Sequence, residues 1–206
     1  MDPVWLKWAK ELAAISQNGL TFSDNAYDIE RYQAVRRIAA AMMSAQSNLD
    51  ADALMALFER EEGYATPKVD VRGVVFRENR ILLVKEKIDG GWTLPGGWAD
   101  PCQSPSEGVV REIREESGYE SEARRLLAVY DRSKHPHKPP LPFHIYKMFF
   151  LCEITGGSPK VSHETTAVDF FPEDHLPELS ISRVLPDQIA RMFEYYRNPD
   201  WPVYFD

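Results

Sequence analysis

One stretch, residues 97–119 (GWADPCQSPSEGVVREIREESGY), constrains what this chain can fold into more than any other. Its second half is rich in good helix formers and stops at Gly118, which predicts a short helix ending in a glycine cap. On such a helix Glu112, Glu115 and Glu116 lie at positions i, i+3 and i+4, so three carboxylates share one face. Because like charges at that spacing repel, this face is stable when a cation lies among them.

The acidic face predicts a metal site, with a solvated charged surface as the alternative. Runs such as REIREE are usually exposed helix faces. An all-oxygen cluster, however, suits hard divalent ions such as Mg²⁺, Mn²⁺ or Ca²⁺. Arg111, four residues before Glu115, is expected to pair with that carboxylate. Gly96 and Gly97 lack a Cβ, so the backbone before the helix can bend sharply and approach this face.

The stretch resembles the Nudix box, in which a Gly, five spacers, a Glu and seven spacers precede Arg-Glu-apolar-any-Glu-Glu-any-Gly-apolar. The positions in register are Gly97, Arg111, Glu112, Ile113, Glu115, Glu116, Gly118 and Tyr119. One position departs, because Gln103 stands where the family has its first Glu. In the family that residue supports the loop and the helix. An amide is therefore expected to keep hydrogen bonds there while losing a charge.

The resemblance implies an α/β/α sandwich with a mixed sheet, and metal-assisted hydrolysis of a diphosphate linkage without a covalent intermediate. It implies Mg²⁺ or Mn²⁺ as cofactor, held by Glu112, Glu115, Glu116 and the backbone carbonyl of Gly97. The candidate catalytic residues are Glu116, Glu164 and Arg111. Nudix enzymes take their general base from the box or from a distant loop, and Glu164 precedes a late strand in such a loop. A surface role for Glu164 is the alternative.

The pattern along the chain predicts a helical domain over residues 1–66 and a Nudix domain over residues 67–206. Helices are expected at 3–18, closed by Gly19, at 28–46, and from an Asp50 cap onward. From Val69 the period changes to that of strands. Strands are expected at 69–76, 80–87, 123–131, 144–154 and 167–171, and a last helix at 186–196.

This order resembles the Nudix subgroup with a helical N-terminal domain, whose members cleave a nucleoside diphosphate linked to another group. The implied substrate is a nucleoside diphosphate derivative of CDP-choline or ADP-ribose type. Two arginines are candidate substrate-binding residues. Arg72 alternates with apolar neighbours in the first strand, and Arg132 lies in a Pro-rich loop. A solvated position is the alternative for both.

Composition excludes several classes of protein. The net charge of −8 over 206 residues leaves no broad excess of Lys and Arg for a nucleic-acid partner. No stretch approaches the roughly 18 apolar residues that cross a bilayer, and the N-terminus lacks the order of a signal peptide. The two cysteines predict no disulfide framework. We therefore expect a cytoplasmic protein without membrane association.

Two further expectations concern activity and assembly. A non-catalytic Nudix-fold sensor of a nucleotide metabolite is the alternative function, favoured by Gln103. Residues 1–66 are acidic overall, unlike the basic DNA-binding domains that such regulators usually carry. Trp5 and Trp8 lie in a helical region with little core of its own. These tryptophans are expected to lie in a core or in a subunit interface. The specific expectation is a homodimer that covers them.

Overall fold

The computed structural model describes all 206 residues and divides into two compact units. The helical unit comprises Met1–Pro67 together with Pro140–His144. The hydrolase unit comprises Lys68–Pro139 and Ile145–Asp206. No helix in either unit combines the length and the apolar character needed to span a membrane. Each unit is described separately below.

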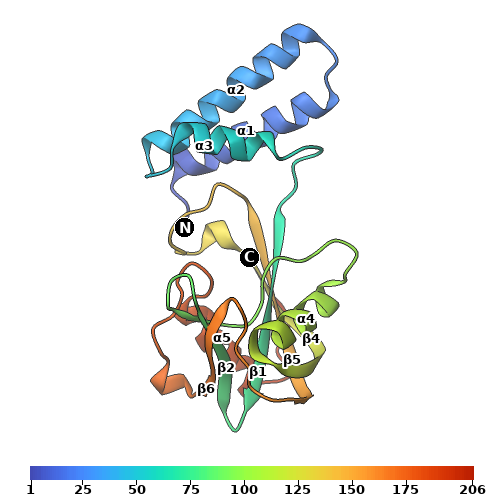
Figure 1. Cartoon of the computed structure of the whole chain (residues 1–206), viewed down its shortest axis with the longest axis vertical. Coiled ribbons are helices and arrows are strands. Elements are labelled where there is room, and N and C mark those ends of the chain that lie inside the picture. The colour runs from blue at the N-terminus through green and yellow to red at the C-terminus, as the bar shows by residue number, and fades with distance from the viewer. The chain divides into compact units, whose positions relative to one another are not determined.

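The helical unit consists of α1 (Val4–Phe22), α2 (Ala26–Ala45) and α3 (Ala51–Glu59). Helices α1 and α2 form a hairpin, and α3 lies against it (Figure 1). The side chain of Asn25 accepts hydrogen bonds from the first turn of α2, and that of Asp50 accepts one at the start of α3. One small apolar cluster holds the three helices together, with Leu6, Ala9, Ala40, Met43, Leu54 and Phe58 as its buried members.

The first helix ends later than expected, and small residues form its buried face. It continues three residues beyond Gly19, because that glycine faces α2: a Cβ there would lie 2.4 Å from the ring of Tyr32. Small residues such as Ala9 fill the contact between the helices and permit close approach. Trp8 and Ile15 point to solvent instead, with exposed fractions of 56% and 55%.

The hydrolase unit is built on one seven-stranded sheet. Its strands are β1 (Lys68–Arg77), β2 (Arg80–Glu86), β3 (Trp92–Thr93), β4 (Tyr119–Asp131), β5 (Ile145–Gly157), β6 (Thr165–Phe171) and β7 (Tyr204–Phe205). The order is β3-β2-β1-β5-β4-β7, and β6 pairs with β2. Strand β1 runs parallel to β5 and β4 runs parallel to β7, while the remaining pairs are antiparallel. The mixed sheet is confirmed.

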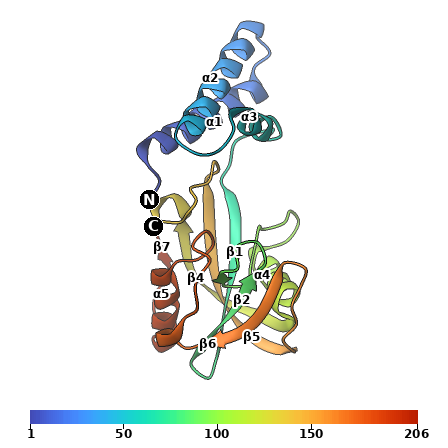
Figure 2. The same cartoon turned by 60° about the vertical axis from the view of Figure 1, so that its left-hand side comes forward.

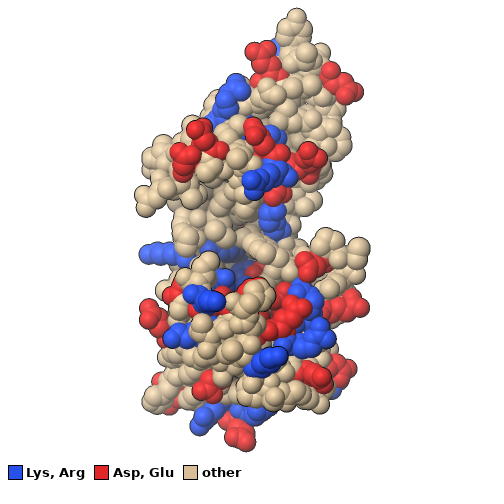
Figure 3. Space-filling view, in the orientation of Figure 1, with Lys and Arg blue, Asp and Glu red and all other residues tan.

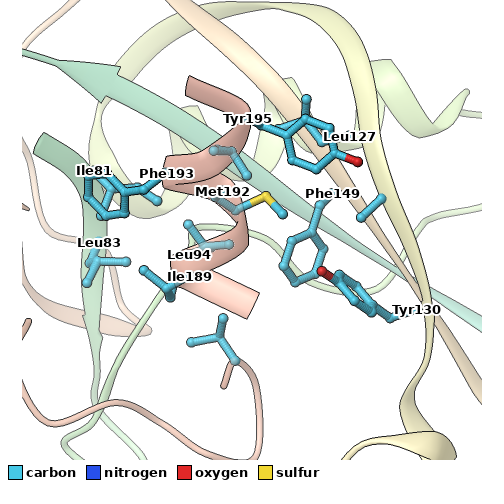
Figure 4. Close-up of a cluster of buried hydrophobic side chains, with 13 residues drawn as sticks. Ile81, Leu83, Leu94, Leu127, Tyr130, Phe149, Ile189, Met192, Phe193 and Tyr195 are labelled. Carbon is cyan, nitrogen blue, oxygen red and sulfur yellow. The ribbon is translucent and has the colours of Figure 1, made fainter. Parts of the chain in front are cut away.

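Two helices cover opposite faces of the sheet, α4 (Pro105–Ser117) and α5 (Pro186–Arg197) (Figure 2). Alternate residues of the strands point to opposite faces, and each set contributes to a separate core. Leu82 packs with α4, whereas its neighbours Ile81 and Leu83 pack with α5. On the α5 side, Met192 and Phe193 lie among strand side chains that include Phe149 and Tyr130 (Figure 4). The α/β/α sandwich is confirmed.

Short elements and strand ends complete the unit. Two 3₁₀ turns, η1 (Arg132–Lys134) and η2 (Glu173–His175), follow β4 and β6. Strand β4 begins at Tyr119, four residues before the expected start, because it pairs with the far end of β5. Strand β7 was not expected from the sequence, because two residues are too few to show the alternating pattern of a strand. Helix α4 ends as predicted, with Gly118 in the left-handed conformation at φ 76°.

Candidate active site

Helix α4 places the three box carboxylates in a gradient of burial. A capping box starts the helix, because Ser104 and Glu107 each satisfy the other's backbone N–H. From this fixed start the acidic face runs from exposed Glu115 through Glu112, with side chains 50% and 13% exposed, to Glu116, which is 5% exposed. The carboxylates therefore share one face, as the spacing predicts, but lie in different environments.

Arg111 holds the outer part of this face. Its Nη1 lies 2.8 Å from Glu115 Oε2, which confirms the predicted pair. Its Nη2 lies 2.9 Å from Glu112 Oε1 and 2.8 Å from Asp100 Oδ2. Its Nε donates to Gln103 Oε1 at 3.1 Å, so the amide in place of the first box Glu keeps a hydrogen bond, as expected. Arg111 thus orients two of the three carboxylates.

Glu116 is held by the glycine turn. The backbone N–H of Gly96 donates to Glu116 Oε2 at 2.8 Å. Gly96 has φ 144°, and a Cβ there would lie 2.0 Å from the carbonyl oxygen of Val71, so only glycine fits. Burial raises the pKa of Glu116 to about 8, against the opposing effects of Arg72 and of the Gly96 hydrogen bond. Burial therefore makes the Glu116 carboxylate a stronger base than an exposed glutamate.

The donor set fits a hard divalent ion. Burial, together with repulsion from Glu115, raises the pKa of Glu112, although Arg111 opposes this. The backbone of Gly97 lies against the same carboxylate, since a Cβ there would be 3.3 Å from its oxygens. The Gly97 carbonyl accepts from the Val71 N–H at 2.8 Å and keeps a second lone pair. In this structure, however, no three His, Cys, Asp or Glu side chains converge closely enough to form a metal site by themselves.

Arg72 is buried rather than directed at solvent, with 3% of its surface exposed. Its Nε and Nη2 donate to the carboxylate of Asp70 at 2.8 and 2.6 Å, and its Nη1 donates to the Leu94 carbonyl at 3.1 Å. Lys147 donates to the same carboxylate at 2.6 Å. Burial raises the pKa of Asp70, but the two cations outweigh it and bring the pKa to about 2. Contact between Arg72 and substrate stays a prediction.

Burial also acts on the cations of this cluster. It lowers the pKa of Lys147 to about 7 and outweighs the attraction of Asp70, and repulsion from Arg72 acts in the same direction as burial. The positive field of Arg72 also reaches Glu116 and Glu112, whose ionised forms it favours. The cluster is therefore a fixed positive support beneath the acidic face. Its sequence signal was charged residues inside apolar strands, in VDVRGVVF and IYKMFF.

Glu164 lies on the loop between β5 and β6, which contacts the end of the acidic helix where the Lys160 N–H donates to the Ser117 carbonyl. The next residue, Thr165, donates its hydroxyl to the Glu116 carbonyl at 2.9 Å and pairs with Glu86 across the β2–β6 ladder. The Glu164 carbonyl accepts from the Lys87 N–H at 2.9 Å, and its exposed side chain lies 3.0 Å from His163 Nε2. The loop is thus anchored beside the site, while the role of the Glu164 carboxylate as a base stays a prediction.

Arg132 is 4% exposed and fixes its own loop. Its Nη2 donates to the carbonyls of Pro139 and Ser182 at 2.8 and 3.4 Å. His137 of the same loop contacts the neighbouring carbonyl of Ile181 through Nδ1 at 2.9 Å. The Pro-rich loop is therefore tied to the segment 180–182, and substrate contact by Arg132 stays a prediction.

Glu86 and Arg183 form a charged pair that the sequence analysis did not select. Glu86 ends strand β2 with 3% of its surface exposed, and its Oε1 lies 2.6 Å from Arg183 Nε. Burial raises the pKa of Glu86, whereas Arg183 and Arg72 lower it. The charge in the strand LLVKE was a weak signal for Glu86. Arg183 ends the segment LPELSISR, which resembles the subgroup but assigns no role to the arginine.

Two family models match the chain. Residues 3–58 match a UDP-X-like, N-terminal oligomerisation domain, and residues 66–192 match the NUDIX domain. The NUDIX match includes the whole box, both arginine candidates and Glu164.

On the face shown in Figure 3, acidic and basic side chains of the hydrolase unit are interspersed.

The chain is also similar to proteins of known sequence or structure. A putative ADP-ribose pyrophosphatase of Bacillus subtilis is 50% identical over 202 residues, which cover 98% of this chain and 97% of that protein. A crystal structure of a UDP-X diphosphatase is 31% identical, covers 98% of both chains and superposes with a TM-score of 0.65. An ADP-ribose pyrophosphatase of Streptococcus suis is 38% identical over 68% of this chain and 100% of its own, with a TM-score of 0.60. With its box in register, its fold and these relatives, the chain belongs to the Nudix hydrolase family.

Proposed function

We propose that this Nudix hydrolase cleaves the diphosphate linkage of a nucleoside diphosphate joined to a second group, of ADP-ribose or UDP-X type. The products would be a nucleoside monophosphate and a phosphorylated second group. The names of the relatives support this class of substrate, and CDP-choline belongs to the same class. The observation that carries the proposal is the acidic face of α4 behind the Gly96–Gly97 turn.

Nudix enzymes generally use divalent metal ions, and we propose Mg²⁺ or Mn²⁺ here. Glu112, Glu115, Glu116 and the Gly97 carbonyl would hold the metal. Bound there, it would offset the charge of the diphosphate and activate water. Binding requires Arg111 to release part of its hold on Glu112 and Glu115, because the three carboxylates do not converge in this structure.

Three residues of the chain have further proposed roles in the reaction. Glu116, held by the Gly96 N–H, provides a fixed acceptor at the buried end of the acidic face. Glu164 has an exposed carboxylate on a loop anchored to Glu116, so it can reach a water without disturbing the fold. Arg72, fixed by Asp70, keeps a positive charge behind the carboxylates.

The helical unit is proposed to join two copies of the chain. Its match to an oligomerisation domain supports an oligomer, and the exposed apolar side chains of α1 support a homodimer. The same domain is proposed to span residues 1–66, with the Nudix domain following over 67–206. A role of the helical unit in capping the substrate is part of the same proposal.

A substrate panel tests the activity. Purified protein is incubated with ADP-ribose, a UDP-sugar and CDP-choline, with Mg²⁺ or Mn²⁺, and phosphate is measured after treatment with alkaline phosphatase. We expect turnover of at least one compound, no turnover in EDTA, and a nucleoside monophosphate among the products. Calorimetric binding without turnover of any compound would contradict the proposal and indicate a metabolite sensor.

A further inference from the structure

Three arginines outside the box helix are candidates to contact a phosphate, and they differ in exposure. Arg72 uses three nitrogens on Asp70 and Leu94 and is buried. Arg132 is buried and donates to two carbonyls of its surroundings. The side chain of Arg183, by contrast, is 30% exposed. A substrate phosphate could reach Arg183 without any rearrangement of the core.

The contacts of Arg183 leave the outer edge of its guanidinium open. Nε lies 2.6 Å from Glu86 Oε1, and Nη1 makes a long contact of 3.5 Å to the hydroxyl of Ser182. The Nη2 nitrogen has no partner in the chain. The short contact with Glu86 is an ion pair without an aligned hydrogen bond, since Oε1 accepts no hydrogen bond. Glu86 therefore anchors the charge of Arg183 without using its fork.

Backbone pairing places this arginine at the acidic face. Glu86 lies opposite Thr165 in the β2–β6 ladder, and the Thr165 hydroxyl donates to the Glu116 carbonyl at 2.9 Å. The contacts from Arg183 through Glu86 and Thr165 thus reach the backbone of Glu116, the residue that carries the buried box carboxylate. Repulsion from Glu86 raises the pKa of Glu116, which is consistent with this proximity.

The loop that carries Arg183 is firmly held. The Ser180 hydroxyl donates to Asp89 Oδ2 at 2.6 Å, and the Ser180 N–H donates to the Trp92 carbonyl at 2.8 Å. The Arg183 N–H donates to the Ser180 carbonyl at 2.8 Å. The backbone of Arg183 is therefore fixed before substrate arrives, and a planar guanidinium on a fixed backbone matches phosphate oxygens in a bidentate manner.

We propose that Arg183 binds the diphosphate of the substrate and that Glu86 is the positioning residue that holds its guanidinium beside the acidic face. The inference rests on the proposed hydrolysis of nucleoside diphosphate derivatives. It adds a fixed cation to a site whose other side chains are mainly acidic. A negatively charged substrate thus meets Arg183 on one side and the metal-binding carboxylates on the other.

The test compares Arg183→Ala, Arg183→Lys and Glu86→Gln with wild type, using the best substrate of the panel. Arg183→Ala should raise KM about 30-fold, because a charge-assisted bidentate contact is lost, and should change kcat less. Arg183→Lys keeps the charge but loses the fork, so its KM should lie between the two. Glu86→Gln should raise KM by a few-fold, since the amide keeps the shape of the carboxylate but loses the charge that holds the Arg183 guanidinium in place.

A second readout separates binding from structure. Methylenediphosphonate, a diphosphate that the enzyme cannot cleave, is titrated calorimetrically into each variant, and its affinity should fall in parallel with the rise in KM. Arg124→Ala is the matched control, because Arg124 forms a strand ion pair with Glu153 at 2.7 Å and is half-exposed. Its KM and its affinity should equal those of wild type.

The outcomes distinguish this inference from the proposed function. If wild type turns over a substrate while Arg183→Ala keeps KM and methylenediphosphonate affinity within about twofold, the inference is wrong and the function stands. Should Arg183→Ala fail to fold, the same criterion applies to Arg183→Lys. If wild type turns over nothing, the function fails, and the methylenediphosphonate titration still decides whether Arg183 binds a diphosphate.

Discussion

The helical unit and the hydrolase unit depart in opposite ways from the usual division between apolar interior and polar surface. In the helical unit, large apolar side chains of the first two helices face solvent. They are Val4, Trp8, Ile15, Phe22, Tyr27 and Ile38, each more than half exposed. In the hydrolase unit, charged side chains are nearly fully buried. They are Asp70, Arg72, Glu86, Glu116, Arg132 and Lys147.

The difference shows that each unit has features that do not stabilise its own fold. Exposed apolar surface gains free energy only when another surface covers it, so the helical unit is suited to association. Buried charges are costly unless they are paired, and the hydrolase unit pairs Asp70 with two cations while leaving Glu116 with one backbone donor. The unpaired acidity is concentrated at the proposed metal site.

The largest expected effect comes from removing the buried charge of the acidic face. Glu116→Gln should lower kcat about 1,000-fold, because the amide keeps the shape and the Gly96 neighbour but cannot act as an anionic ligand. Glu122→Gln is the control, since Glu122 is an exposed strand carboxylate whose pair with Arg124 is superficial. Steady-state kinetics of both variants would measure the effect. An unchanged kcat in Glu116→Gln would contradict the proposed role of Glu116 in binding the metal.

The features predicted correctly from the sequence are those set by local spacing. The extent of the acidic helix, its Gly118 cap and the pair between Arg111 and Glu115 follow from the helical period alone. The hydrogen bond that Gln103 keeps with Arg111 followed from the resemblance. Each of these depends on residues within one short stretch of the chain.

The features that the sequence did not predict depend on distant partners. Arg72 is buried because Lys147, 77 residues from Asp70, arrives on the neighbouring strand and completes the charged cluster. The pair between Glu86 and Arg183 joins a strand to a loop nearly a hundred positions later. The packing face of α1 also depends on a distant partner: Ala9, rather than Trp8, lies in the buried cluster with Ala40 of α2. Which side chains are buried, and which distant residues pair, depends on how whole helices and strands pack together.

A smaller effect should come from the exposed apolar side of α1. Trp8, Ile15 and Phe22 are spaced by seven residues and all face solvent, a spacing typical of a helix that packs along a second helix. Trp8→Ser should weaken the dimer by about 2 kcal/mol, or roughly 30-fold in dissociation constant, as expected for a buried interface tryptophan. Light scattering over a dilution series would measure the change.

The matched control for Trp8 lies one residue earlier. Lys7→Ala removes an exposed charge whose contact to Glu11 is long, at 3.9 Å, so it should leave the dimer unchanged. The fold of the Trp8→Ser monomer should also be intact, because Trp8 is outside the buried cluster of the helical unit. A wild-type chain that stays monomeric at every concentration would contradict the proposed dimer and the comparison drawn between the units.

The smallest effect concerns acid stability, which the buried polar groups of the hydrolase unit should lower. Burial lowers the pKa of His137 to about 3, and the nearby cations Lys147 and Arg132 act in the same direction. Between pH 6.5 and 3 the unfolded chain therefore binds a proton at His137 that the folded chain does not, so stability falls as pH falls. From pH 7.5 to 5.5 the loss from this group is about 1.4 kcal/mol.

Urea unfolding of wild type and His137→Gln at the two pH values isolates this contribution, because every other titrating group is common to both proteins. The wild type should lose about 1.4 kcal/mol more than the variant. His163→Gln is the control, since the His163 side chain is 88% exposed and should leave the pH dependence unchanged. Equal losses in wild type and His137→Gln would mean that His137 is accessible to protons in the folded chain. The loop it holds against Ile181 would then open more readily than its contacts indicate.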